Sequence, residues 1–121
     1  AAQLTAFTIG EDGRLSDRRL WAMTMSDMSR PRVPDGICLD AEGAVWIASA
    51  TAPECIRIAE GGEVLDVVTA SQNVFACMLG GEDGRTLFMM TAPTSDDEEA
   101  GREPLGKVEV AEVTVGRAAR P

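Results

Sequence analysis

The chain has 121 residues, of which 45% are hydrophobic, so it forms at most one domain with a real core and is not disordered by composition. Its 11 basic and 20 acidic side chains give a net charge of −9, which argues against a nucleic-acid surface because phosphate binding needs clustered Lys and Arg. The three cysteines form no CxxC pair and the chain has no His, which excludes structural zinc sites of the Cys/His kind and His-dependent catalytic triads.

Strand signals follow one another along the whole chain. Residues 4–9 (LTAFTI) alternate in polarity, GEDGR makes a tight turn, and residues 15–23 return as a strand. Two prolines and a glycine in MSRPRVPDG break any helix there. Only DDEEAGRE has the composition of a helical turn. Further strands are predicted in ICLD and VWIASA around an AEG turn, in a hairpin over 54–70, in VFACML and TLFMMTA around GGEDGR, and in KVEVAEVTV over 107–115.

Two internal sequence similarities indicate a repeat. FTIGEDGRL aligns without gaps on IRIAEGGEV, and the stretch from Leu39 aligns on the one from Leu79, a shift of about forty residues. Short strands repeated at that period are typical of a β-propeller with four strands per blade. Chance similarity between Gly-rich hairpins is the alternative. The strand count predicts one partial propeller domain: the end of one blade in 1–30, a complete blade in 31–70, and most of the last blade in 71–121.

Several stretches carry a resemblance to a known family. PDGICLDAEGAVWIA (34–48), FACMLGGEDGRTLFMMTA (75–92) and the opening LTAFTIGEDGRLSDRRLWA (4–22) resemble the senescence marker protein/gluconolactonase family, also called the regucalcin and luciferin-regenerating-enzyme group. Its members are six-bladed propellers that bind a divalent metal in the central channel and hydrolyse sugar lactones or related esters. The resemblance implies an all-β fold: a partial six-bladed β-propeller of about two and a half blades of four-stranded antiparallel sheet, matching the C-terminal half of a usual member.

The resemblance also implies a metal-binding and catalytic role for Asp35. In the family, the Asp of the PDG triplet is a metal ligand at the inner end of a blade's first strand and has been assigned proton transfer. The oxygen-rich site suits Ca²⁺ first, with Mg²⁺, Mn²⁺ or Zn²⁺ as alternatives. A metal of this kind polarises a carbonyl and activates bound water. The expected function is therefore the C-terminal portion of a divalent-metal-dependent lactone or ester hydrolase.

Other interpretations of these residues stay open. The family's Glu and Asn ligands match no stretch of this chain, so the isolated chain is expected to be inactive. Asp35 also precedes a Gly, where an Asp often only caps a turn. A non-catalytic binding or scaffold module with the same blades is the alternative function. Phe75, at the position matching Asp35 in the next repeat, is expected to line the channel, a role compatible with core packing.

The expected surroundings follow from composition and strand count. Each cysteine lies in an apolar run, which predicts buried, reduced thiols and a cytoplasmic location. No apolar run approaches the roughly 20 residues that span a membrane, and no signal peptide is expected. The opening AAQLTAF, without Met, is typical of an excised or processed piece. The expected partner is a small-molecule lactone or ester, with no nucleic acid and no membrane, and missing N-terminal blades or self-association would cover the open sheet edges.

Overall fold

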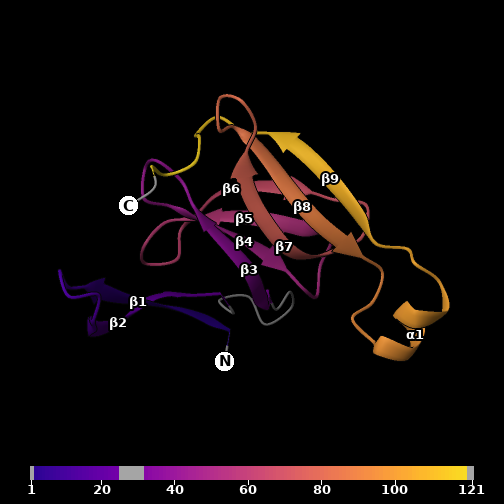
Figure 1. Ribbon diagram of the computed structural model, residues 1–121, viewed down its shortest axis with the longest axis horizontal. Coiled ribbons are helices and arrows are strands. Elements are labelled where there is room, and N and C mark those ends of the chain that lie inside the picture. The colour runs from indigo at the N-terminus through magenta and orange to yellow at the C-terminus, as the bar shows by residue number, and fades with distance from the viewer. Residues whose placement is uncertain (1, 25–31, 120–121) are drawn as a thin grey trace.

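The computed structural model describes residues 2–24 and 32–119, which form three antiparallel sheets in sequence order. The sheets contain two strands (β1–β2), four strands (β3–β4–β5–β6) and three strands (β7–β8–β9), and within each sheet every strand pairs with the next one along the chain (Figure 1). The elements are β1 (Gln3–Ile9), β2 (Leu15–Met23), β3 (Pro34–Leu39), β4 (Val45–Ser49), β5 (Glu54–Ile58), β6 (Val64–Thr69), β7 (Asn73–Gly80), β8 (Thr86–Ala92), α1 (Asp97–Arg102) and β9 (Lys107–Glu112).

Asp-Gly turns close the β1–β2 and β7–β8 hairpins, whereas the β3–β4 turn has two residues between Asp40 and Gly43. In the turn between β1 and β2, the backbone N–H of Arg14 donates to Asp12 Oδ1, and Gly13 has a φ of 77°. This left-handed conformation costs glycine little, because it has no Cβ to collide with the backbone. The expected strand order is confirmed, because local alternation and these turns together specify the hairpins.

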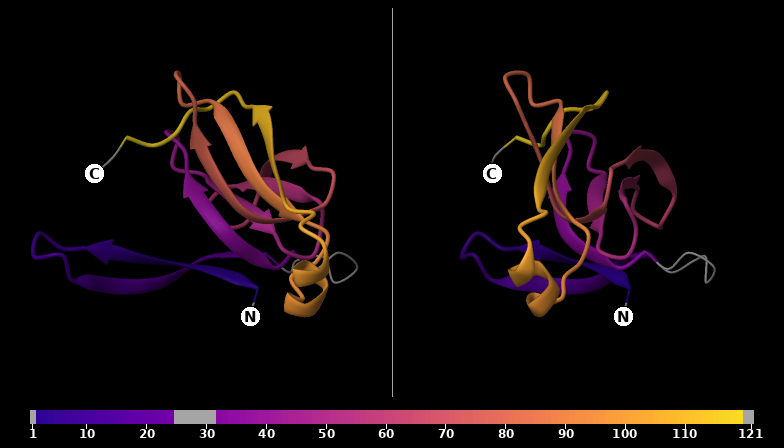
Figure 2. Two further views of the ribbon diagram at one scale, coloured as in Figure 1. Left: turned by 45° about the vertical axis from the view of Figure 1, so that its right-hand side comes forward. Right: turned by 90° about the vertical axis from the view of Figure 1, so that its right-hand side faces the viewer.

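The two central strands of the middle sheet, β4 and β5, are buried on both faces. On one face, Val45 and Ile47 of β4 join Ile56 and Ile58 of β5 in a cluster that also contains Leu4 of the β1–β2 hairpin. On the other face, a second cluster joins the middle sheet to β7–β9, and its members are Cys38, Trp46, Ala48, Cys55, Val74, Cys77, Leu79, Leu87, Met89 and Val113. The sheets are therefore held face to face by two apolar layers, and Figure 2 shows the β1–β2 hairpin reaching out from this body.

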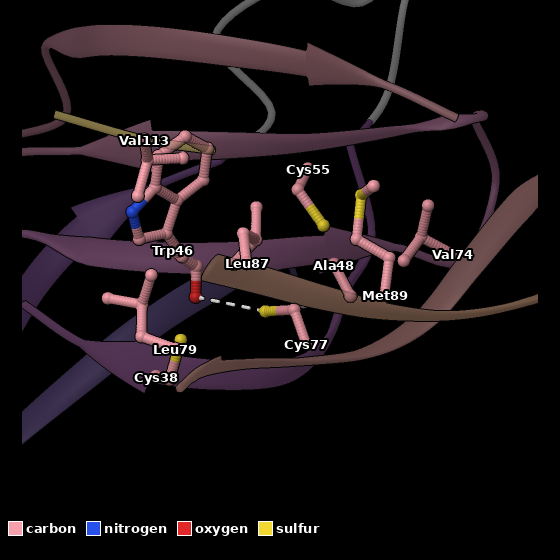
Figure 3. Close-up of a cluster of buried hydrophobic side chains, with 10 residues drawn as sticks. All are labelled: Cys38, Trp46, Ala48, Cys55, Val74, Cys77, Leu79, Leu87, Met89 and Val113. Carbon is pink, nitrogen blue, oxygen red and sulfur yellow. Dashed lines mark hydrogen bonds between the residues drawn. The ribbon is translucent and has the colours of Figure 1, made fainter. Parts of the chain in front are cut away.

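The three cysteines come together in the second cluster, as Figure 3 shows. All three are free thiols, and the Cys77 thiol points at the carbonyl oxygens of Gly36 and Trp46, at 3.6 and 3.7 Å. Its hydrogen bond with Cys38 lowers the pKa of Cys77, but the hydrogen bond with Cys55 and burial outweigh this and raise that pKa to about 12. The hydrogen bond with Cys77 and burial raise the pKa of Cys38 well above its usual range.

Stability is expected to fall as the pH rises above about 9, because both thiols have a higher pKa when folded than the ordinary value of 9.0. Their contribution is complete below that pH and is lost between about 9 and 12 for Cys77, at up to about 1.4 kcal/mol per pH unit and thiol. The chain has no Tyr, and Lys107 is its one lysine, so few other groups titrate there. Urea unfolding midpoints measured across this pH range test the expectation. The midpoint of Cys77→Ala should fall less steeply with pH than that of the wild type. A wild-type midpoint that does not change with pH would contradict the expectation.

The C-terminal region departs from the predicted strand over 107–115. Strand β9 ends at Glu112, where the alternation changes phase, and Val113 turns into the core beside β8. The following residues cross back to the middle sheet, where the N–H of Ala41 donates to Gly116 O and the N–H of Ala118 donates to Leu39 O. These hydrogen bonds connect the residues after β9 to the β3–β4 turn. The two segments are far apart in the sequence, so local patterns could not predict this contact.

Helix α1 forms within the acidic run between β8 and β9. The Asp96 carboxylate caps it by accepting from the backbone N–H of Glu99 at 2.9 Å, and acidic side chains fill its exposed first turn. The helical turn that the composition indicated is therefore present, and its acidic side chains are exposed. In the described residues, 2–24 and 32–119, no helix is long and apolar enough to span a membrane.

Candidate functional site

Asp35 lies at the start of an edge strand. It is the second residue of β3, which among the described strands pairs with β4 alone, and its side chain is exposed. The register between the two strands shifts between Pro34 and Ile37, so Asp35 and Gly36 occupy an irregular stretch of the ladder. Such irregularities re-aim side chains and are over-represented next to active sites. The structure therefore presents the Asp35 carboxylate to solvent at the strand end.

Phe75 occupies the equivalent place in the next sheet. It lies near the start of β7, which is also an edge strand, and the register with β8 shifts between Val74 and Ala76. Its half-buried side chain lines a shallow hollow together with Met90 and Val108. Matching irregularities at Asp35 and Phe75, forty positions apart, show that the sequence echo corresponds to a structural repeat.

Gly36 allows the two edge strands to approach each other at this point. A Cβ on Gly36 would lie 2.6 Å from Ala76 Cα, closer than real Cβ atoms come to other atoms, and 3.1 Å from the carbonyl oxygen of Phe75, which is a tight contact. The starts of β3 and β7 are therefore in direct contact. We call this contact between Gly36 and Phe75–Ala76 the seam; Asp35 and Phe75 lie in the two strands that form it. Sequence reasoning missed the role of Gly36, although it is the third residue of the PDG triplet that drew attention to Asp35.

A second polar group lies at the opposite end of β3. The Asp40 side chain is fully buried and accepts hydrogen bonds from the backbone N–H groups of Glu42 and Ala44 and from Arg57 Nε, the last at 2.6 Å. The hydrogen bond to Asp40 raises the pKa of Arg57 despite its burial. The signal that could have predicted this pair is a lone Arg inside the apolar strand ECIRI. Because each group is satisfied by the other, the pair ties the β3–β4 turn to β5.

The described residues do not complete a metal site. Residues 2–24 and 32–119 contain no group of three or more His, Cys, Asp or Glu side chains that could hold a metal ion. Asp35 offers one carboxylate, whereas Ca²⁺ takes six to eight oxygen ligands. A cation at Asp35 would therefore need oxygen ligands other than a cluster of acidic side chains in these residues.

The structure is similar to solved β-propellers over almost its full length. It matches a luciferin-regenerating enzyme with a TM-score of 0.79 and 22% identity, and a calcium-binding regucalcin from Agrobacterium tumefaciens strain C58 with a TM-score of 0.73 and 16% identity. Each match covers 98% of this chain and 40% of the other. The sheets therefore form part of a six-bladed β-propeller, about two and a half blades, as predicted, with β3 and β7 as consecutive edge strands.

Sequence comparison gives the family. Residues 1–93 match the model of the SMP-30/Gluconolactonase/LRE-like region. Regucalcin from Danio rerio is 31% identical over 93 residues, which are 74% of this chain and 30% of that protein, and regucalcin from Xenopus laevis is 30% identical over 89 residues. The chain belongs to the SMP-30/gluconolactonase/LRE-like family, which confirms the resemblance, and it spans about 30% of the length of these relatives.

Proposed function

We propose that this chain supplies part of the channel wall of a lactone or ester hydrolase, and that Asp35 is its reactive carboxylate. The observation that carries the proposal is the place of Asp35, exposed at the start of an edge strand where two consecutive blades touch, in a chain of this family. Edge strands on the inner side of propeller blades border the central channel. An exposed carboxylate there is free to take a proton from an attacking water.

We further propose that Asp35 is one ligand of a divalent cation, with Ca²⁺ as the first choice and Mg²⁺, Mn²⁺ or Zn²⁺ as alternatives. A carboxylate oxygen suits such hard cations, and the regucalcin with the similar fold is a calcium-binding protein. The 121-residue chain alone is expected to bind Ca²⁺ weakly, because Asp35 is a single carboxylate. Calorimetric titration of the chain with Ca²⁺ would measure this affinity, and tight binding would show that a donor set exists within these residues.

The second candidate is a binding or scaffold module that keeps the blades without catalysis. It is favoured by the position that matches Asp35 in the next sheet, which holds the apolar Phe75 rather than a second acid. The two candidates differ in one measurable property, which is hydrolysis of a lactone by a polypeptide that carries this sequence.

Asp35→Asn is expected to lower kcat for γ-lactone hydrolysis about a hundredfold, because it removes the proton acceptor and keeps the side-chain size. The assay is acid release at constant pH by a longer polypeptide that carries this sequence, with EDTA and with Ca²⁺ restored. Asp66→Asn is the matched control, because Asp66 is an exposed strand Asp on β6 at the other edge of the sheet.

The outcomes separate the roles of Asp35. Loss of turnover with unchanged calcium affinity and melting temperature indicates a base, whereas weaker calcium affinity indicates a ligand. If Asp35→Asn keeps full activity, or if the variant unfolds, Asp35 has only the structural role of capping the turn. Wild-type activity that survives exhaustive metal removal would contradict the metal-dependent mechanism, and absence of any lactone hydrolysis would favour the scaffold module.

A further inference from the structure

The three cysteines gather between the second and third sheets. Cys38 comes from β3, Cys55 from β5 and Cys77 from β7, and all three belong to the apolar cluster that joins the two sheets (Figure 3). They are free thiols, and Cys77 is hydrogen-bonded to both of the others. Both sheets belong to this chain, so the cluster is complete without any further blade. The proposed hydrolysis at Asp35 does not use these thiols.

The seam brings the backbones of β3 and β7 close together beside this cluster. Sheets that pack face to face usually lie about 10 Å apart. At the seam, by contrast, there is no room for a Cβ on Gly36 beside Ala76 Cα. Cys77 follows Ala76 directly, and its thiol lies 3.6 Å from Gly36 O, so its side chain points at β3. Because a disulfide needs Cα atoms within about 7 Å of each other, this close approach favours one between Cys38 and Cys77.

The three thiols differ in their access to solvent. Cys38 is 8% exposed, and it lines an open hollow of about 630 Å³ on the surface together with Leu79 and Gly80. Cys77 is 4% exposed, and Cys55 is completely buried. A small oxidant that enters from solvent therefore reaches Cys38 first, and Cys77 is the thiol that is hydrogen-bonded to it.

We propose that Cys38 and Cys77 form an oxidation site, at which a peroxide converts the two thiols into a disulfide that joins β3 to β7. First, the Cys38 sulfur attacks one oxygen of hydrogen peroxide. An S–O bond forms, the O–O bond breaks, and the leaving hydroxide takes up the thiol proton as water. The Cys77 sulfur then attacks the sulfenic sulfur of Cys38, so that the S–S bond forms, the S–O bond breaks and a second water leaves. The two thiols together lose two electrons and two protons, and one peroxide is reduced to two waters.

This oxidation is expected to be slow. Burial and the hydrogen bonds between the thiols raise the pKa of both Cys38 and Cys77, and the thiolate is the form that reacts. Few molecules carry a thiolate at neutral pH, so the disulfide accumulates during sustained exposure to peroxide rather than after a brief pulse.

The oxidised chain is expected to be more stable than the reduced chain. The disulfide closes the stretch of chain between β3 and β7 into a loop, which restricts the unfolded state. The interaction that is lost is the contact of the Cys77 thiol with Gly36 O, and a thiol is a weak donor. Oxidation therefore fixes β3, the strand that carries Asp35, to β7 at the seam.

The test is oxidation of the folded 121-residue chain with hydrogen peroxide, followed by unfolding and counting of free thiols. We expect the free thiols to fall from three to one, because only Cys55 stays unpaired. The mass should fall by about 2 Da, and peptide mapping should link Cys38 to Cys77. The urea midpoint should rise on oxidation and return when a reductant is added.

Single alanine variants separate the roles of the three thiols. Cys55→Ala is the matched control, and it should form the disulfide at the rate of the wild type. Cys38→Ala should slow disulfide formation at least about tenfold, because the two remaining thiols are the less accessible ones. Circular dichroism checks that each variant is folded before oxidation.

The peptide map of the wild type decides the proposal even if a variant does not fold. A link between Cys55 and Cys77, a link between two chains, or oxidation of Cys38 to sulfinic acid while Cys77 stays free overturns it. A wild-type chain that keeps three free thiols after prolonged exposure to peroxide overturns it as well. A disulfide that forms only at urea concentrations that unfold the chain has the same consequence, because the native contact between β3 and β7 would then play no part.

Discussion

Asp40→Ala is expected to lower the free energy of unfolding by about 3–5 kcal/mol, because it leaves the buried Arg57 guanidinium without its main partner. Asp40 is fully buried, and its carboxylate accepts three hydrogen bonds, two from its own turn and one from Arg57. The remaining partner of Arg57 is Glu42, which is largely exposed and gives less compensation. The midpoint and slope of urea unfolding measure the loss.

The chain contains a matched control for this substitution. Asp83 caps the corresponding turn of the next sheet, accepts from the backbone N–H of Arg85, and pairs with the Arg85 side chain at 2.9 Å. Both side chains of that pair are half exposed, so Asp83→Ala should lower the free energy of unfolding far less than Asp40→Ala does. Asp40→Asn should fall between the two, because the amide oxygen still caps the turn. Equal losses at Asp40 and Asp83 would show that burial does not strengthen the first pair.

Gly36→Ala is expected to destabilise the fold by about 3 kcal/mol, at the upper end of the usual cost of overpacking a close-packed site. The added Cβ would lie 2.6 Å from Ala76 Cα, and backbone cannot move aside as a flexible side chain can. To relieve the collision, β3 and β7 must separate, which pulls Gly36 O away from the Cys77 thiol and opens the core beside it. The cysteines should therefore react faster with a thiol reagent in the folded variant.

Gly101→Ala provides the control for Gly36→Ala. Gly101 lies in α1 with nothing within 4 Å of its added Cβ, so alanine there should be neutral or slightly stabilising. Both variants remove one glycine from the unfolded chain, so the difference between them reports mainly the collision, together with the smaller helix-propensity gain at Gly101. If the two variants unfold at the same urea concentration, the close contact between β3 and β7 does not exist in solution, and Asp35 and Phe75 do not share an end of one seam.

Much of the fold could be predicted from local patterns. Alternation over LTAFTI and TLFMMTA, with Asp-Gly turns between strands, indicated hairpins because a strand's side chains alternate between two faces and such turns match the strand twist. The prediction was wrong at the end of KVEVAEVTV, where Val113 leaves the strand to fill the core beside β8. Its burial depends on a distant sheet, which the local alternation does not describe.

The sequence by itself determined the all-β class, the hairpin order, the forty-residue repeat and the choice of Asp35, since these depend on near neighbours in the chain and on the PDG triplet. Only the tertiary structure decided that Gly36 lets β3 touch β7, that Arg57 reaches the buried Asp40, and that one face of the last sheet stays uncovered. These features join residues that are 17 to 41 positions apart or depend on which sheet lies alongside. Steric fit and burial between residues this far apart depend on how the sheets pack, so the local periodicity of the sequence cannot predict them.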